Sequence, residues 1–368
     1  MSTTRIALPV CCVLLLAGCG DAPARIKVPD GVRVTTVATR VARPANLAFG
    51  ARGAMWTTST GYAPAASDGV WRTARAGARP RQIVRRLDTA LGLVWYRGEL
   101  YVSHRVRAGA GHVGRVTAFS RFDGRRFHRR RIVLARLPVG QHNVDSIVPG
   151  PGGRLYVGVG SVADARRGRS RHSASVLSFL PSGRGLRVEA RGFRNPYGLA
   201  FVPGTRNLLV SDNGRDDLGL FRPPDELNLV DTAHRGSAHF GFPGCFGQGG
   251  RACARTVTPL ARLAPHAAAG AVTVARRFGR YGLSAFVAEN GSSFSANPTG
   301  SDVVRVSLRR RGRGYRAVVH RFARGFGRHD PLGAAIGPDG ALYVTLYRSA
   351  KIVRFSVRPP VHRGSTKG

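Results

Sequence analysis

Short apolar runs separated by glycine-containing turns recur along the chain. The unit is an apolar strand, a turn with glycine, and a second apolar strand rich in β-branched and aromatic residues. Clear copies are 46–59, 92–104, 146–160, 198–212 and 333–347. A sixth copy with a longer turn occupies 271–290. Each copy predicts a β-hairpin whose turn glycine takes a positive φ and whose alternating side chains bury one face.

The spacing of the hairpins indicates how they assemble. It leaves room for two further strands per copy, as in 118–137 and 303–322. A lone hairpin cannot bury enough apolar surface to be stable, so the units must share a core. Four strands repeated six times predict an all-β fold, a six-bladed β-propeller, over 34–358. A β-sandwich with an appended domain explains the regular repeats poorly.

The N-terminus has the layout of a secretory signal peptide over residues 1–18, with Arg5 before an apolar run. The run is too short to cross a bilayer as a helix. The small residues before Cys19 are typical of a bacterial lipoprotein, in which this cysteine is lipidated and residues 19–33 form a tether. An ordinary cleaved signal with a chance cysteine is the alternative. We therefore expect an exported protein, anchored by lipid at the extracytoplasmic face of the cell membrane.

Cysteine usage agrees with an exported protein. Cys11 and Cys12 leave with the signal peptide, and Cys19 takes the lipid, so Cys245 and Cys253 remain. Two cysteines eight residues apart across a glycine-rich segment favour a local disulfide in an oxidising compartment. A metal site is the alternative, but two ligands without a nearby third are too few.

The chain is strongly basic, with 58 lysine and arginine residues against 19 acidic ones and a formal net charge of +39. Arginine supplies nearly all of this charge, and it is spread from Arg33 to Arg363, including a basic tail at 359–368. A nucleic-acid-binding protein would gather its basic residues on one face, so we expect no nucleic-acid partner. Attraction to anionic lipids or cell-wall polymers is expected as a side effect.

Several motifs near the repeat strands carry a family resemblance. They are R-N-P-x-G-L at 194–199, D-N-G-R-D at 212–216 and P-P-[DE]-E-L-N at 223–228. At 240–243 the chain has F-G-F-P, which is similar to the motif Y-G-W-P. Upstream, His142 lies eight residues before Gly150, the spacing that the family's catalytic histidine keeps from its G-P-D-G turn. With these motifs the mature chain resembles the glucose/sorbosone dehydrogenase family of soluble quinoprotein sugar dehydrogenases, which are six-bladed β-propellers.

The resemblance implies oxidation of a sugar, aldose or related aldehyde by pyrroloquinoline quinone (PQQ) with Ca²⁺. It makes His142 the general base and Arg194 a catalytic residue that also binds the cofactor. Asn195 and Arg328 are further expected cofactor contacts. The resemblance places calcium on the backbone of Gly214 and Arg215. Asp225 and Glu226 are expected to serve a second, structural calcium or to cap that loop.

Some positions depart from the family pattern. Where relatives have A-E-H-G-S-W-N-R, this chain has Asn290, Ser293 and Ser295 in place of the histidine, the tryptophan and the arginine. Two extra residues follow Arg328, so its reach toward the site is open. His142 could also be a histidine satisfied within a loop, and His266 could line the channel or only pack.

Two further classes of function stay open. The first is a non-catalytic propeller that binds an anionic glycan or a protein. The second is a propeller lactonase, which would need several carboxylates on a metal and is disfavoured by the few acidic residues. No motif identifies the sugar or the electron acceptor.

Overall fold

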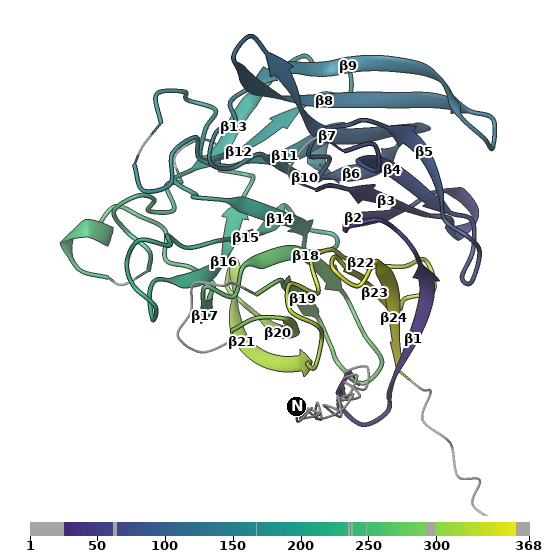
Figure 1. The fold of residues 1–368 in the computed structure, drawn as a ribbon. Helices are drawn as coiled ribbons and strands as arrows, with labels where there is room; N and C mark the ends of the chain where they lie inside the picture. The colour runs from purple at the N-terminus through teal and green to yellow at the C-terminus, as the bar shows by residue number, and fades with distance from the viewer. Residues whose placement is uncertain are drawn as a thin grey trace, which may run out of the picture.

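The computed structural model describes residues 26–61, 65–166, 168–234, 236, 238–247, 249–291 and 299–357. They form six four-stranded antiparallel sheets arranged around a centre (Figure 1). This part of the chain contains no α-helix, only the short 3-10 segments η1 (Ala51–Gly53), η2 (Pro151–Gly153) and η3 (Arg251–Cys253). It therefore holds no helix able to span a membrane. The predicted signal peptide, Cys19 and the 359–368 tail lie outside the described residues.

The first three blades follow the chain, each from its inner to its outer strand. Blade one contains β2 (Pro44–Phe49), β3 (Met55–Ser59), β4 (Gly69–Thr73) and β5 (Arg81–Arg85). Blade two contains β6 (Leu93–Tyr96), β7 (Glu99–Ala108), β8 (Gly111–Phe122) and β9 (Phe127–Leu137). Blade three contains β10 (Val144–Gly150), β11 (Arg154–Val159), β12 (Ser175–Phe179) and β13 (Arg187–Arg191).

The last three blades complete the ring. Blade four contains β14 (Pro196–Phe201), β15 (Asn207–Asp212), β16 (Pro224–Asp231) and β17 (Ala261–Pro265). Blade five contains β18 (Ala269–Ala275), β19 (Ser284–Glu289), β20 (Asp302–Arg311) and β21 (Gly314–Ala323). Blade six contains β22 (Ala334–Ile336), β23 (Leu342–Leu346), β24 (Lys351–Val357) and the N-terminal strand β1 (Val32–Thr39).

The six predicted hairpins are the first two strands of each blade, which confirms the six-bladed β-propeller. Their turns contain glycines of positive φ, such as Gly98 at 78° and Gly340 at 73°, a conformation that costs other residues free energy. The inner strands β2, β6, β10, β14, β18 and β22 surround the axis (Figure 1). Residues of all six line a channel cavity of about 450 Å³.

Closure of the ring corrects the predicted tether. Residues 26–33 do not hang free of the domain. Val32 lies opposite Val357 and Thr39 opposite Lys351, so β1 becomes the outer strand of blade six. Upstream, the backbone of Lys27 exchanges two hydrogen bonds with that of Arg324, at 2.8 and 3.0 Å. The two ends of the propeller are therefore held together by a strand pair that local sequence patterning does not reveal.

Burial differs from the one-faced pattern expected for the hairpins. All residues of β11, β15 and β19 are buried, on both faces of their sheets. The reason is the arrangement of the core, in which six apolar clusters each lie between two neighbouring blades. A seventh, smaller cluster contains Ala45, Leu91, Tyr197 and Leu332. Each of these blades is covered on both sides by its neighbours, so these second strands have no solvent face, whereas the end of β7 in blade two extends into solvent.

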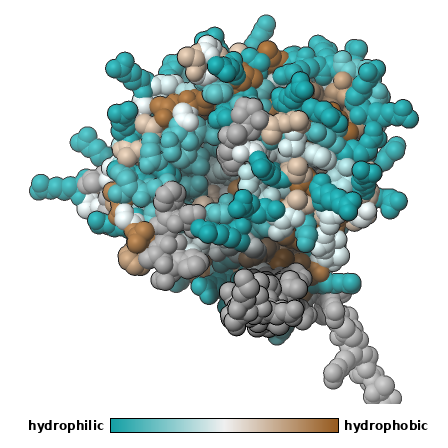
Figure 2. Space-filling model, viewed as in Figure 1, coloured by the Kyte–Doolittle hydropathy of each residue, from teal (hydrophilic) through white to brown (hydrophobic). Residues whose placement is uncertain are grey.

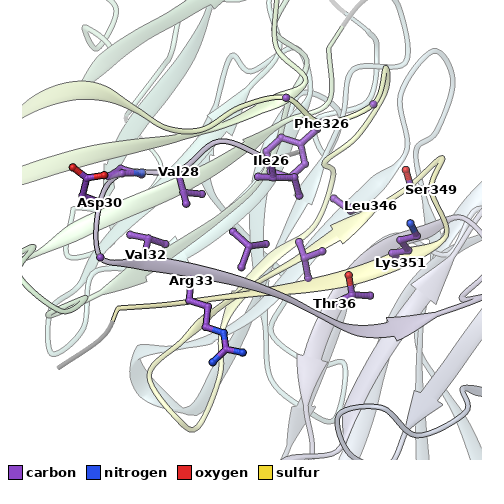
Figure 3. A pocket seen from close by; sticks show the side chains of 16 residues that line it. Ile26, Val28, Asp30, Val32, Arg33, Thr36, Phe326, Leu346, Ser349 and Lys351 are labelled. Atoms are coloured by element: carbon purple, nitrogen blue, oxygen red, sulfur yellow. The ribbon is translucent and has the colours of Figure 1, made fainter. Parts of the chain in front are cut away.

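A cleft of about 770 Å³ lies where the N-terminal segment crosses onto blade six. Figure 3 shows Ile26, Val28 and Val32 facing Phe326 and Leu346 across it. Elsewhere hydrophilic residues cover most of the face seen in Figure 2, with scattered apolar ones. This surface agrees with the dispersed arginine charge of the sequence.

Candidate functional site

Loops from blades three to six meet at one mouth of the channel and enclose a cavity of about 270 Å³. His142 precedes β10, Arg194 precedes β14, Gly214 follows β15 and His266 precedes β18. The remaining lining residues are Gln141, Asn213, Asp216, Asp225, Ala268, Gly291 and His329. The structure thus brings His142 and Arg194 to the same mouth.

Arg194 is held in place by two carboxylates. Its Nη2 lies 2.6 Å from Asp216 Oδ2 and 2.5 Å from Asp164 Oδ1, and its Nε donates to Asp164 Oδ1 at 3.1 Å. The Arg194 side chain is only 5% exposed, against 33% for Asp164 and 39% for Asp216. Charge-assisted bonds of this kind are short and directional, so the guanidinium orientation is well defined.

His142 is a buried imidazole with an unused nitrogen. Its side chain is 13% exposed, and Nε2 lies 3.8 Å from Asp164 Oδ1, too far for a hydrogen bond. Nε2 has no hydrogen-bond partner. Burial, with the charge of Arg194 as a second cause, lowers the pKa of His142 to about 3. The ring is therefore neutral at pH 7 and can accept a proton.

Asp212 positions the backbone of Arg194 and Asn195. Its carboxylate accepts the Arg194 N–H at 3.1 Å and the Asn195 N–H at 2.6 Å. Burial, together with the nearby Glu226 carboxylate, raises the pKa of Asp212 well above its usual value. Asn195 Nδ2 donates to Asn213 Oδ1 at 3.0 Å, and Asn195 Oδ1 has no partner. Asn195 lies behind Arg194 and does not line the cavity.

Asp225 fixes the backbone of the loop at Gly214 and Arg215, where calcium is expected. This carboxylate accepts the Gly214 N–H at 2.8 Å and the Ala269 N–H at 2.9 Å. Glu226 Oε2 accepts from Asn228 at 3.1 Å, and Glu226 Oε1 has no partner. Burial raises the pKa of Asp225 to about 6 and that of Glu226 to about 7. These contacts match the loop-capping role expected for Asp225.

Arg215 lies outside this cavity. Its guanidinium contacts Asp217 at 2.6 Å and the Pro243 carbonyl at 2.9 Å. Within the described ranges, no group of three or more His, Cys, Asp or Glu side chains is arranged to hold a metal ion. Calcium at this loop would therefore depend on backbone carbonyls and on few side chains.

The last blade contributes a different residue from the one expected. Arg328 is exposed and does not line the cavity, whereas the next residue, His329, does. The His329 ring contacts the Gly291 carbonyl at 3.2 Å, and Asn290 Nδ2 donates to the His329 carbonyl at 2.8 Å. In this loop, therefore, His329 and not Arg328 reaches the mouth. Ser293 and Ser295 lie outside the described residues.

Sequence reasoning missed Asp164 and His329. Asp164 contacts both His142 and Arg194, but it stands in an arginine-rich loop between β11 and β12 without a motif of its own. His266 is resolved as a lining residue: its Nε2 contacts the Gly219 carbonyl at 2.9 Å and its Nδ1 lies 3.5 Å from Asp216. Only the tertiary structure joins these loops.

Three lining residues have left-handed backbones without being glycine. φ is 55° at His266, 52° at Ala268 and 60° at His329. Each such residue costs on the order of 1 kcal/mol or more, and such strain gathers at functional sites. Behind the cavity, Cys245 and Cys253 form the predicted disulfide, with Cα atoms 5.2 Å apart.

Comparisons with known proteins give structural matches and one partial sequence match. No protein-family profile matches the chain. An uncharacterized protein of Borreliella burgdorferi is 29% identical over 222 residues. That match covers 55% of this chain and 56% of the other protein, so the chain spans about half the length of the curated relative.

Solved structures match over most of the chain. A putative oxidoreductase (glucose dehydrogenase) of Thermus thermophilus is 25% identical, with a TM-score of 0.68 over 88% of this chain and 99% of its own. The PQQ domain of pyranose dehydrogenase from Coprinopsis cinerea is 17% identical, with a TM-score of 0.74 over 92% and 99%. The calcium structure of a Trichoderma reesei carbohydrate-active enzyme of family AA12 is also 17% identical, with a TM-score of 0.75 over 91% and 98%. The chain is thus a structural relative of the pyranose and glucose dehydrogenases and shares their six-bladed β-propeller.

Proposed function

We propose that this protein is a PQQ- and calcium-dependent dehydrogenase that oxidises a sugar or related aldehyde outside the cytoplasmic membrane. The observation that carries the proposal is the meeting of His142 and Arg194 in one cavity at a propeller mouth. The fold is shared with a pyranose dehydrogenase PQQ domain and a glucose dehydrogenase. A cavity with a few convergent polar groups is the usual form of a small-molecule site.

The residues present fit the cofactor in part. PQQ, when bound, supplies a quinone that accepts a hydride from the substrate carbon. Arg194 would hold its anionic oxygens, with Asn195 behind it and the carbonyls of Gly214 and Arg215 offered to calcium. Asp164 and Asp216 already neutralise Arg194, so a divalent cation is needed to make this mouth attractive to an anionic molecule.

His142 would take the proton from the substrate hydroxyl as the hydrogen on the same carbon leaves with its electron pair. The neutral ring has Nε2 available for that proton. Asp164, 3.8 Å away, is placed to stabilise the imidazolium that forms. The substrate carbon thereby becomes a carbonyl.

The membrane location is part of the same proposal. It rests on the signal-peptide layout and on Cys19, whose lipid would hold the propeller at the extracytoplasmic face. Residue 26, where the described chain begins, is only seven residues beyond Cys19. A lipid at Cys19 would therefore hold the propeller close to the membrane surface.

Reconstitution tests the proposal. The purified protein is incubated with PQQ and Ca²⁺, and dye reduction is followed with a panel of aldoses. His142→Ala should lower turnover by about 10²–10⁴-fold, the usual share of a general base, while cofactor absorbance after desalting stays near wild type. Arg194→Gln should lower both cofactor retention and turnover. His104→Gln, a buried histidine outside the cavity, is the control and should change neither.

One observation favours a second function, a non-catalytic binding module. Arg194 is paired with two carboxylates, and Asn290 is engaged with the backbone of the last blade, where the family pattern has a histidine. Failure of the wild-type protein to retain PQQ at saturating Ca²⁺ would favour this reading over the enzyme.

A further inference from the structure

A separate basic cleft of about 260 Å³ lies between the loop that follows β11 and the loop that follows β16. Arg169, Arg171 and Arg191 line it together with His239, and no acidic residue does. It neighbours the candidate site, because Arg191 stands three residues before Arg194 and the loop after β11 also carries Asp164. The two cavities share no lining residue.

The floor of the cleft is rigid. The Arg191 N–H donates to the Ala238 carbonyl at 3.1 Å, and the Phe240 N–H donates to the Arg191 carbonyl at 2.8 Å. On the other side, the Gly192 N–H donates to the Ala174 carbonyl at 2.9 Å. Both walls are thus hydrogen-bonded to the same two floor residues, so the backbone of the floor is fixed without a ligand.

Gly192 allows the imidazole of His239 to lie against the floor. Its φ is 82°, and a Cβ placed there would stand 2.6 Å from His239 Cε1 and Nδ1. His239 Nδ1 accepts the Gly241 N–H at 3.1 Å. The ring proton of the neutral tautomer is therefore on Nε2, which makes Nε2 the donor of this side chain.

The charge in the cleft is uncompensated. Among the described residues, no carboxylate forms an ion pair with Arg169, Arg171 or Arg191. Arg191 Nε is buried and has no hydrogen-bond partner. Buried donors are nearly always satisfied in folded proteins, so this N–H is available to an acceptor supplied from outside.

We propose that this cleft binds an oxyanion, carried either by an acidic saccharide or by a free inorganic anion. Guanidinium groups match carboxylate, sulfate and phosphate geometry. Basic charge is abundant elsewhere on this protein. The cleft differs from that background in its hydrogen-bonded floor and in gathering three arginines without a lining carboxylate. Binding here does not depend on the proposed redox function.

Titration calorimetry on the purified protein, without PQQ, tests the site. The probes are inorganic phosphate, glucuronate, acetate and glucose at low ionic strength. Arg169→Gln/Arg171→Gln should weaken oxyanion binding about tenfold or more, since each lost charge-assisted bond is worth at least that factor. Arg191→Gln should do the same. The matched control is Arg309→Gln/Arg311→Gln, which removes the same charge from exposed positions on β20 and should leave Kd unchanged.

The outcomes separate the two sources. An acidic saccharide is identified as the carrier if glucuronate binds at least tenfold more tightly than acetate and glucose does not bind. Phosphate binding tighter than glucuronate identifies a free anion. The proposal is overturned if neither phosphate nor glucuronate binds. It is also overturned if Arg309→Gln/Arg311→Gln weakens binding as much as Arg169→Gln/Arg171→Gln does. Because Arg169 and Arg171 are exposed, their variant tests the site even if Arg191→Gln fails to fold.

Discussion

The buried neutral state of His142 predicts a measurable pH dependence of stability. The unfolded chain protonates this histidine near pH 6.5, whereas the folded protein does so only near pH 3. Because the folded pKa is depressed, its stabilising contribution is present above pH 6.5 and is lost as the pH falls toward 3. Between pH 7 and pH 5 the unfolded state gains nearly one proton that the folded state does not. This difference amounts to about 2 kcal/mol of unfolding free energy.

Urea unfolding of wild type and His142→Gln at pH 7 and pH 5 measures this contribution. From pH 7 to pH 5 the unfolding free energy of the wild type should fall by about 2 kcal/mol more than that of the variant, since glutamine does not titrate. The pKa of His104 is lowered to about 4, again by burial first, so His104→Gln is a positive control with a similar change in slope. Equal pH slopes for wild type and His142→Gln, with the His104 control behaving as expected, would refute the neutral, buried imidazole. The proton-acceptor role would then lose its physical basis.

Three further predictions concern other parts of the molecule. Burial raises the pKa of Glu226 to about 7. As the pH rises from 5 to 8 in calcium-free buffer, the unfolding free energy of the wild type should therefore fall by about 2 to 3 kcal/mol relative to that of Glu226→Gln. Identical pH dependence of the urea curves of the two proteins would contradict this. Gly158→Ala would place a Cβ 2.1 Å from the Pro196 carbonyl, between blades three and four, and should lower stability by about 1–3 kcal/mol in thermal melts, whereas the same change at open Gly111 should not. Cys19→Ala should abolish membrane partitioning in cell fractionation; unchanged partitioning would show that the basic surface, not lipid, holds the protein.

The fold was largely readable from local patterning. Each hairpin of the repeat contains its own turn glycine and apolar strands, so its existence depends on residues close in sequence. The strand β1 was not readable, because its partner β24 lies at the other end of the chain. The sequence pattern also did not indicate that β11 and β15 are buried on both faces, since this burial depends on a neighbouring blade on each face.

At the site, the sequence by itself determined which motif residues stand at strand ends, and strand ends of a propeller converge at its mouths. The family resemblance named His142 and Arg194 as site residues, and both line one cavity. The tertiary structure decided which other loops reach the same cavity. It placed Asp164 between the two residues, brought in His329 and left Arg328 exposed. The physical reason is that contacts between loops far apart in sequence, such as the ion pair of Arg194 with Asp164 and the hydrogen bond from Asn290 to the His329 carbonyl, fix where these loops end.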